Sequence, residues 1–551
     1  MSNIDNNFIK KRLHYALYVI FAVFFIIVLK LIYLSIIGYK KDFSAYNSSN
    51  VKIRRHDITD RSGNVLAIEV PSVSVYLRPK DIKDKPKAVI ALVESLNITE
   101  EVAHKMVNSQ ASFLWVKRNI SKEEDQKLKY KGILGIYFEK ETKRFYPYGS
   151  LFSHIIGMTD IDGKGVSGVE NSFNEQLYEN DVKLSVDLKL QRILYDAISE
   201  AVKNNQAKRG YGMIVDPNTS EVLAMVSLPD FNPNERMDMN ISHMFNYTTQ
   251  GLIEPGSISK VFSVAMALEN GTYRVEDKFD VSKPIVNNSY IIVDFDYMNK
   301  SINIPEVLMY SSNIATSIMM KELGINTQIY YLNKFNLFKE TSIELAEKAP
   351  SLTVSKWNDL TAMTVSYGYG LALSQATFIN AFAAIINGGN YIPLTLLKRN
   401  DKDILSKKRV LSSETSEQMK RILRLVVSKG SGRRGDVEGF SVGGKTGSAE
   451  KQAKGRYQKD AVIASFVAFF PSNKPKYAII VSIDEPKRVK FNNYNTTGGA
   501  LSAPVVRTII SKITTTYSLE KVADDTASVV KTNQKQLVDY VLKRNDGKHE
   551  N

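Results

Sequence analysis

The chain has 551 residues, of which 43% are hydrophobic and 24% charged, so it is long enough for two to four folded domains. It contains no cysteine, which excludes disulfides, a thiolate nucleophile and cysteine-based metal sites. The net charge of +15 would suit binding to an anionic surface such as lipid headgroups. No nucleic-acid-binding motif accompanies the charge. Nucleotide bias in the genome, which makes a chain rich in Lys, Asn and Ile, explains the charge slightly better.

An apolar segment over residues 13–38 predicts a single transmembrane anchor, because its length suffices to cross a bilayer as one helix. Lys30 lies near its outer end and can reach the membrane interface. The basic cluster at 10–12 predicts a cytoplasmic tail over residues 1–12, with everything after the anchor outside the membrane. A cleaved signal peptide is the weaker alternative, because the apolar stretch is long and no small-x-small cleavage site follows it.

Residues 39–180 are predicted to form a non-catalytic pedestal, since they contain no nucleophile–base pair and no metal-ligand spacing. Residues 55–67 predict a strand, a turn at Ser62-Gly63-Asn64 and a second strand. Residues 79–130 are charged and mostly helical in pattern. His56 and His154 are isolated histidines, for which a structural role is expected.

Residues 181–516 are predicted to form an α+β domain with helices against an antiparallel sheet, because strands are followed by helices and then by strands again. The expected elements are a strand at 184–188 that enters a helix near Gln191, a hairpin over 212–226, a helix at 376–387, and strands at 463–470 and 476–484. Residues 517–551 form a polar tail that is too short for another domain.

A Pro255-Gly256 turn opens a helix with Ser257 in its first turn and Lys260 three residues later, so the two side chains share one helical face. A serine hydroxyl needs an adjacent base, and a lysine can be that base if burial and neighbouring positive charge lower its pKa. An isolated S-x-x-K is weak evidence, because chance produces several in a chain of this composition.

Two further motifs follow in the same domain. Ser311-Ser312-Asn313 is an S-x-N that presents a hydroxyl and an amide on one short loop, and Lys445-Thr446-Gly447-Ser448 follows two glycines and precedes a strand. K-T-G is expected well under once by chance, and the three motifs in this order make a strong signal.

These motifs resemble those of penicillin-recognising serine enzymes, and the chain looks most similar to the class B penicillin-binding proteins of the division-specific, septal kind. The resemblance runs from the anchor to about residue 512. It includes the segments 55–67 and 144–173 in the pedestal, and the segments 367–370, 465–471 and 498–504 in the catalytic domain. It implies an α+β protein with one transmembrane helix, an elongated mixed α/β pedestal of the dimerisation type, and a transpeptidase domain whose antiparallel five-stranded sheet is flanked by helices.

By resemblance, the reaction is D,D-transpeptidation of peptidoglycan stem peptides, inhibited by β-lactams, with no metal or organic cofactor. Ser257 would be the nucleophile and Lys260 its base, and the N–H groups of Ser257 and Ser448 would form the oxyanion hole. Ser311, held by Asn313, would relay a proton. The terminal carboxylate of the substrate would be bound by Lys445, Thr446 and Ser448, with Gly447 allowing close backbone approach.

The resemblance further implies an inner-membrane protein of the division septum, with its catalytic domain periplasmic or extracellular. Its partners would be the glycosyltransferase FtsW of the SEDS family and other division proteins. Three departures from the family pattern stand out, namely His56 for a usual glycine, Ser448 for a usual threonine and Glu450 for a frequent glutamine.

Three other functions compete with the septal enzyme. An elongation-specific transpeptidase would share the chemistry, although the Tyr367–Gly370 segment and the compact pedestal favour division. A β-lactamase would need a deacylating carboxylate and would have no use for the anchor and pedestal. A non-catalytic scaffold or β-lactam sensor should have lost Ser257, Lys260 or Lys445, and all three are present.

Overall fold

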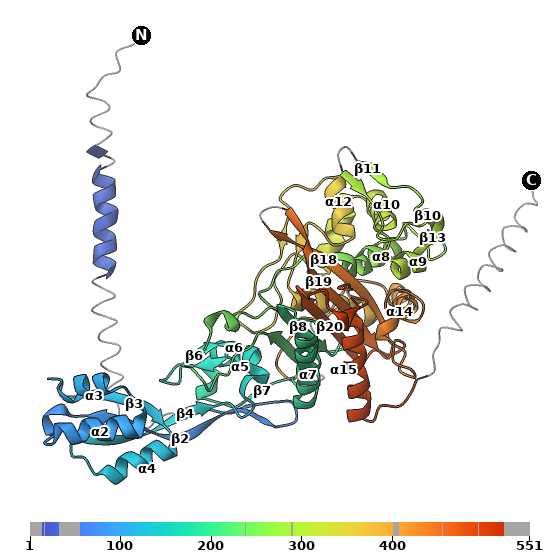
Figure 1. Ribbon diagram of the computed structural model, residues 1–551. Helices are drawn as coiled ribbons and strands as arrows, with labels where there is room; N and C mark the ends of the chain where they lie inside the picture. Colours follow the sequence, from blue (N-terminus) through green and yellow to red (C-terminus); the bar gives the residue numbers. More distant parts are fainter. Residues whose placement is uncertain are drawn as a thin grey trace, which may run out of the picture. The chain divides into compact units, whose positions relative to one another are not determined.

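The structure is a computed structural model that describes residues 14–15, 17–31, 55–236, 239–287, 290–400, 407–453, 456–493 and 495–522 (Figure 1). Backbone contacts divide the chain into two compact units, Met1–Arg54 and Arg55–Asn551. The predicted cytoplasmic tail and residues 523–551 of the predicted C-terminal tail lie outside the described residues.

In the first unit, residues 14–15 and 17–31 are helical. Among the described residues, no helix has both the length and the apolar character needed to cross a bilayer. The anchor predicted over residues 13–38 is described only in part, and it stays a prediction.

The pedestal is built on the long strand β2 (Val65–Leu77), which pairs antiparallel with β1 (Ile58–Thr59), β3 (Leu114–Ile120) and β4 (Ile136–Phe145). Strand β1 also pairs in parallel with β7 (Val182–Lys183). The strand, turn and strand predicted over residues 55–67 are therefore present. The segment 79–130 is mostly helical as predicted, but it also contains β3.

Three helices cover one face of the distal part of this sheet, namely α2 (Lys85–Leu96), α3 (Glu100–Val107) and α4 (Lys122–Lys131). Their apolar side chains pack with Val75 and Leu77 of β2 into a separate small core. Burying one helical stripe against one sheet face is the ordinary way such a layer becomes stable. The remaining pedestal elements are η1 (Pro79–Asp81), η2 (Gly149–Phe152), α5 (Ser153–Ile156), β5 (Met158–Thr159), β6 (Gly165–Ser167), α6 (Gly168–Ser172) and η3 (Gln176–Tyr178).

The catalytic domain is organised around a five-stranded sheet in which every neighbouring pair is antiparallel. Its order is β18 (Gly443–Ala453), β19 (Arg456–Phe470), β20 (Tyr477–Asp484), β8 (Arg209–Val215) and β9 (Val222–Leu228). The strand β18, which carries the K-T-G motif, is thus an edge strand with one side open.

Both faces of this sheet are buried, which explains why its central strands are almost continuously apolar. Alternation along β20 places Ile480 in the core shared with α8 and α13, and Ile479 and Val481 in the core shared with α7 and α15. Figure 1 shows α7 and α15 side by side against the sheet. These two helices span Leu188–Asn204 and Ser502–Thr516.

The opposite face is covered by helices that form the other half of the domain. They are α8 (Lys260–Glu269), α9 (Ile304–Tyr310), α10 (Asn313–Leu323), α11 (Ile325–Lys334), α12 (Asp359–Ser366), α13 (Gln375–Ile386) and α14 (Ser413–Ser428). The short elements are η4 (Ile241–Met244), η5 (Gly256–Ser259), β10 (Lys278–Asp280), β11 (Ile285–Asn287), β12 (Tyr290–Ile292), β13 (Ser301–Asn303), β14 (Leu352–Thr353), β15 (Leu371–Ala372), β16 (Asn390–Tyr391), β17 (Lys408–Arg409), η7 (Arg433–Gly435) and η8 (Lys490–Asn492).

Two local predictions were wrong. Residues 184–188 do not form a strand, because β7 ends at Lys183 and Asp187 caps α7, its carboxylate accepting from the N–H groups of Lys189 and Leu190. An aspartate at this position satisfies the unpaired donors of a helix start. The K-T-G motif was expected to precede a strand, but it lies inside β18.

Candidate active site

The nucleophile segment is held in place by its neighbours before the helix begins. Gly256 has a φ of 57°, in the left-handed region that favours glycine, and its N–H donates to Gly368 O at 3.1 Å. The short helix η5 then carries Ser257, and α8 starts at Lys260. All of the α8 residues from Lys260 to Leu268 are buried, so the helix is a fixed support for the serine.

Lys260, the predicted base, lies next to Ser257, the predicted nucleophile. Its side chain is fully buried, and its Nζ lies 2.9 Å from Ser257 Oγ. The same Nζ lies 3.1 Å from Ser311 Oγ and 2.5 Å from Ser311 O. These distances allow proton transfer between the serine hydroxyl and the amine without movement of the backbone.

Ser311 occupies an unusual backbone position that aims its hydroxyl at both lysines. It ends α9 with a φ of 62°, a left-handed conformation that is uncommon for any residue other than glycine. Ser312 then caps α10, so a two-residue link joins the helices. Lys445 Nζ donates to Ser311 Oγ at 2.9 Å, and the Ser311 hydroxyl therefore lies between Lys260 and Lys445.

The resemblance predicts that Asn313 holds Ser311, but the structure shows no such contact among the described residues. The Asn313 Nδ2 instead donates to Val293 O at 2.8 Å. The S-x-N segment is held by Asp294, whose carboxylate accepts from Ser312 Oγ at 2.7 Å and from the backbone N–H of Asn313 at 2.5 Å. Sequence reasoning missed Asp294, because no motif surrounds it and its partners are 18 and 19 residues away.

The K-T-G segment closes the site from the edge strand. Lys445 is fully buried and its Nζ also donates to Thr446 O at 3.1 Å. A Cβ on Gly447 would lie 2.9 Å from Ile258 Cγ2, so any larger residue would push β18 away from the serine segment. Ser448 keeps the hydroxyl on which its predicted role depends, and its Oγ accepts from the N–H of Gly498 at 3.0 Å.

Burial and charge lower the pKa of both site lysines. Burial has the larger effect on Lys260, the positive charge of Lys445 adds to it, and together they hold the Lys260 pKa well below its usual value against a smaller opposing influence of Asp294. Burial lowers the pKa of Lys445 to about 7. Lys260 is therefore suited to be a neutral base, and Lys445 is the more readily charged partner.

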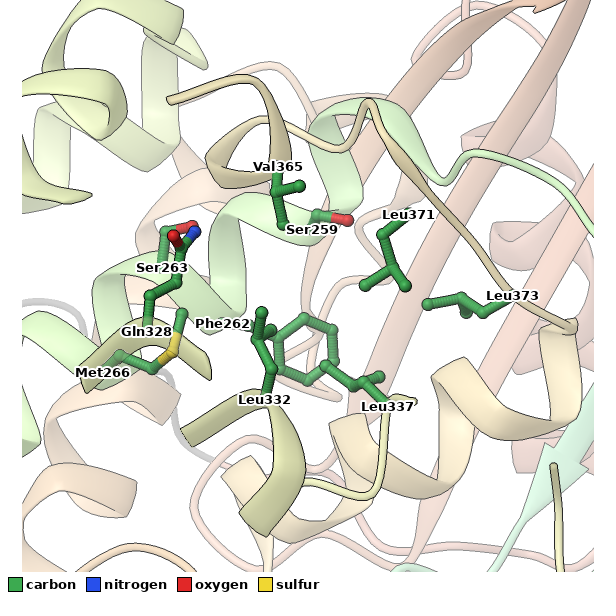
Figure 2. Close-up of a pocket in the computed structure, with 10 residues that line it drawn as sticks. All are labelled: Ser259, Phe262, Ser263, Met266, Gln328, Leu332, Leu337, Val365, Leu371 and Leu373. Atoms are coloured by element: carbon green, nitrogen blue, oxygen red, sulfur yellow. The ribbon is translucent and has the colours of Figure 1, made fainter. Parts of the chain in front are cut away.

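A small cavity lies beside α8 and is not the candidate active site. Figure 2 shows its lining, in which Phe262 projects from α8 toward Leu332 and Leu337. Its volume of about 10 Å³ leaves room for a single water. Neither Ser257 nor Lys260 lines it. Gln328 does, and its Oε1 has no partner among the described residues.

Two other departures from the family pattern can now be located. The His56 ring lies 3.1 Å from Asp181 in the pedestal, away from the site. Glu450 follows the K-T-G segment on β18, but the carboxylate tied to the site is Glu254, which accepts from Gly370 N–H at 2.7 Å and from Tyr457 O–H at 3.0 Å. Sequence reasoning did not assign Glu254 a role, although it immediately precedes Pro255.

Two family models match the chain. Residues 210–511 match the penicillin binding protein transpeptidase domain, and residues 51–183 match the penicillin-binding protein dimerisation domain. The chain belongs to the class B penicillin-binding proteins. It is accordingly an enzyme, a serine-type transpeptidase, and the family resemblance drawn from its motifs is confirmed.

Curated relatives align with most of this class B penicillin-binding protein. A probable peptidoglycan D,D-transpeptidase FtsI of Caulobacter vibrioides is 31% identical over 485 residues, which is 85% of this chain and 82% of that protein. The probable peptidoglycan D,D-transpeptidase PenA of Neisseria gonorrhoeae is 29% identical and covers 87% of each chain. The peptidoglycan D,D-transpeptidase FtsI of Escherichia coli K12 is 28% identical and covers 87% of this chain and 86% of that one.

Solved structures share the fold. Penicillin binding protein 3 from Mycobacterium tuberculosis, crystallised with aztreonam, has a TM-score of 0.69 and 20% sequence identity, and the match covers 85% of this chain and 97% of that one. The two-domain, mixed α/β architecture of this penicillin-binding protein is therefore the one its family uses.

Proposed function

We propose that this class B penicillin-binding protein is the septal peptidoglycan D,D-transpeptidase, which cross-links stem peptides during cell division. The observation that carries the chemistry is the meeting of Ser257 and Ser311, both half-buried, with the buried Lys260 and Lys445 within hydrogen-bonding distance. Relatives named as peptidoglycan D,D-transpeptidases support the choice of substrate.

Acylation begins when Ser257 Oγ attacks the carbonyl carbon between the two terminal D-alanines of a donor stem peptide. The hydroxyl proton passes to Lys260 Nζ, which lies 2.9 Å away. The backbone N–H groups of Ser257 and Ser448 bind the oxyanion. The C–N bond then breaks, and Ser311 Oγ passes a proton to the leaving amine, replenished from the neighbouring lysines.

Transfer reverses these steps with a different amine. The amine of a neighbouring stem peptide attacks the ester carbonyl on Ser257, its proton returns through Ser311 and Lys260, and Ser257 Oγ leaves with a proton restored. Thr446 and Ser448 bind the terminal carboxylate of the donor in the first step through hydroxyl hydrogen bonds, with Lys445 supplying positive charge. A β-lactam is attacked in the same way and stays on Ser257 as a stable ester.

The septal role is favoured over elongation by two features. Relatives named FtsI align along most of the chain. The Tyr367–Gly370 segment lies beside the nucleophile, as the bond from Gly256 N–H to Gly368 O shows. An elongation-specific enzyme would use the same site with other assembly partners.

The anchor, location and partners belong to the same proposal. The apolar segment over residues 13–38 would hold the protein in the inner membrane, with the basic cluster at 10–12 cytoplasmic and the catalytic domain outside. Its partners at the septum would be the SEDS-family glycosyltransferase FtsW and other division proteins.

Conditional depletion in the parent bacterium tests this function. Loss of the protein should give long undivided cells, and a wild-type copy should restore division while Ser257→Ala should not. A fluorescent penicillin should label the wild type at Ser257, stably over hours, and leave Ser257→Ala unlabelled. Rounded cells on depletion would indicate elongation instead, and an adduct lost within seconds would indicate a β-lactamase.

A further inference from the structure

Ser431 lies outside the three motifs, yet its Oγ is 2.9 Å from Thr446 Oγ1. It belongs to the short segment between α14 and η7, about 15 residues before the K-T-G motif. The Ser431 residue is exposed, whereas Thr446 is buried. The pair therefore joins a buried residue of the site to an exposed one.

The backbone around Ser431 fixes the position of its hydroxyl. Ser431 N–H donates to Met309 O at 3.3 Å, two residues before Ser311. A Cβ on Gly499 would lie 2.9 Å from Ser431 O, so this glycine permits the 431 segment to pack closely beside it. The segment is thus held between the end of α9 and the Gly498-Gly499 turn, both of which border the site.

The pairing decides which way the Thr446 proton can point. A hydroxyl has one proton to donate, and it can accept from a second group at the same time. If Ser431 O–H donates to Thr446 Oγ1, the Thr446 proton is left for a substrate oxygen. Lys445 Nζ donates to Ser311 Oγ and Thr446 O, which leaves at most one of its N–H groups, so hydroxyls must supply the other hydrogen bonds that a carboxylate can accept.

We propose that Ser431 is a positioning residue of the carboxylate-binding subsite, where it donates to Thr446 and directs the Thr446 proton to the terminal carboxylate of the donor peptide or β-lactam. This inference rests on the acyl-transfer chemistry of the proposed function. Hydrogen bonds from hydroxyls to a carboxylate are charge-assisted and stronger than neutral ones. If the Thr446 proton points elsewhere, the protein should bind ligands that carry a carboxylate more weakly, and its binding of ligands that lack one should not change.

A pair of serines elsewhere in the domain provides the comparison. Ser441 Oγ and Ser472 Oγ are 2.6 Å apart, and both residues are buried. They join the approach to β18 with the turn after β19, outside the site. A hydroxyl pair there can only contribute to packing and stability.

The test compares two ligands on the full-length protein, benzylpenicillin and its methyl ester, by their second-order rates of acylation at Ser257. Ser431→Ala should lower the acylation rate of benzylpenicillin about 10-fold and change the acylation rate of the ester by no more than about 2-fold. Ser431→Thr, which restores the hydroxyl, should return benzylpenicillin to within about 2-fold of wild type. Ser472→Ala should leave both rates unchanged.

Two results would overturn the inference while leaving the proposed function intact. An equal slowing of both ligands by Ser431→Ala would show a structural effect on the site, and no slowing of either would show that Ser431 does not direct the Thr446 proton. Absence of a Ser257 adduct on the wild-type protein would be a different failure, because it would remove the acyl-transfer chemistry and this inference with it.

Discussion

At the scale of single residues, Lys260 shows how the fold can make a lysine amine suitable for accepting a proton. A lysine in water is protonated at neutral pH and cannot accept a proton from serine. Burial disfavours its charge, and Lys445 adds electrostatic repulsion, so the Lys260 pKa falls well below its usual value. The neutral amine then lies 2.9 Å from the hydroxyl it must activate.

This coupling predicts how the pH profile responds to a change at Lys445. Acylation requires neutral Lys260, so its rate should rise as pH passes through the Lys260 pKa. Lys445→Met removes one of the two causes that lower this pKa, and the acid limb of the profile should therefore move to higher pH. The maximal rate should also fall by about 100-fold, since Ser311 loses a donor. Penicillin acylation rates between pH 5 and 9 measure both effects.

Lys445→Arg is the matched control, because it keeps the positive charge near Lys260. Its acid limb should stay closer to that of the wild type, even if the maximal rate falls. An unchanged acid limb in Lys445→Met would show that Lys445 does not influence the protonation of Lys260.

The sequence motifs named candidate site residues that the structure brings together, but they did not name the residues that support them. S-x-x-K, S-x-N and K-T-G contain hydroxyl and amine groups within the motifs themselves, so the motifs alone point to Ser257, Lys260, Ser311 and Lys445 as candidates. The roles of Asp294 and Ser431 depend on contacts across 18 and 15 residues, and no local pattern marks such contacts. Asn313 was assigned to Ser311 for its place in the motif, but its amide donates to Val293 O.

At the scale of secondary-structure elements, the carboxylate of Glu170 connects the first residues of the pedestal with β4. Glu170 of α6 is fully buried between Arg55 and Arg144, with each guanidinium Nε 2.6 Å from a carboxylate oxygen. Arg55 lies before β1 and Arg144 lies in β4. The two positive charges tolerate burial because Glu170 is between them.

Glu170→Gln should therefore destabilise the pedestal by about 3–5 kcal/mol, because two buried guanidiniums would lose their counter-charge. Glu94→Gln is the control, since Glu94 pairs with Lys131 at 2.6 Å on an exposed surface, and its loss should cost less than about 1 kcal/mol. Urea unfolding followed by circular dichroism measures both. Equal effects of the two substitutions would mean that the buried ion pairs add nothing beyond an exposed one.

Element types followed from periodicity, while their boundaries depended on side-chain capping and sheet pairing. The helix predicted at 376–387 is α13, Gln375–Ile386. The strand predicted at 463–470 lies in β19, and the one predicted at 476–484 corresponds to β20, which begins at Tyr477. The short apolar run at 184–188 looked like a strand, yet Asp187 uses its carboxylate to start α7. Pairing with β19 makes the K-T-G segment part of the sheet. Its glycines are unusual in a strand, so the sequence pattern did not predict one there.

At the scale of the whole molecule, polar contacts join the pedestal to the stretch of the catalytic domain between β9 and η5. Asn234 donates through Nδ2 to Tyr146 O at 2.9 Å and accepts from Tyr146 N–H through Oδ1 at 3.1 Å. His154 Nε2 lies 2.8 Å from His243 O. The partners Asn234 and His243 both lie in the connection between β9 and η5, which leads along the chain to Ser257.

His154 should make this joint sensitive to acid. Burial lowers its pKa from 6.5 to about 4, so the native protein binds the proton only at lower pH than the unfolded chain does. The stability that neutral His154 contributes is therefore present above pH 6.5 and is lost as pH falls toward 4. The loss should be about 3 kcal/mol across that interval, from the difference between the two pKa values.

His154→Gln should remove this share of the pH dependence, because glutamine does not titrate and can still donate to His243 O. His56→Gln is the matched control, since it makes the same replacement at a partly exposed pedestal histidine and shows what loss of an imidazole outside the joint does to the urea midpoints. Urea midpoints of the wild type and both variants at pH 7.0, 5.5 and 4.5 provide the comparison. A wild-type slope that His154→Gln does not reduce would place the acid sensitivity in other groups and show that the joint is not pH-dependent through His154.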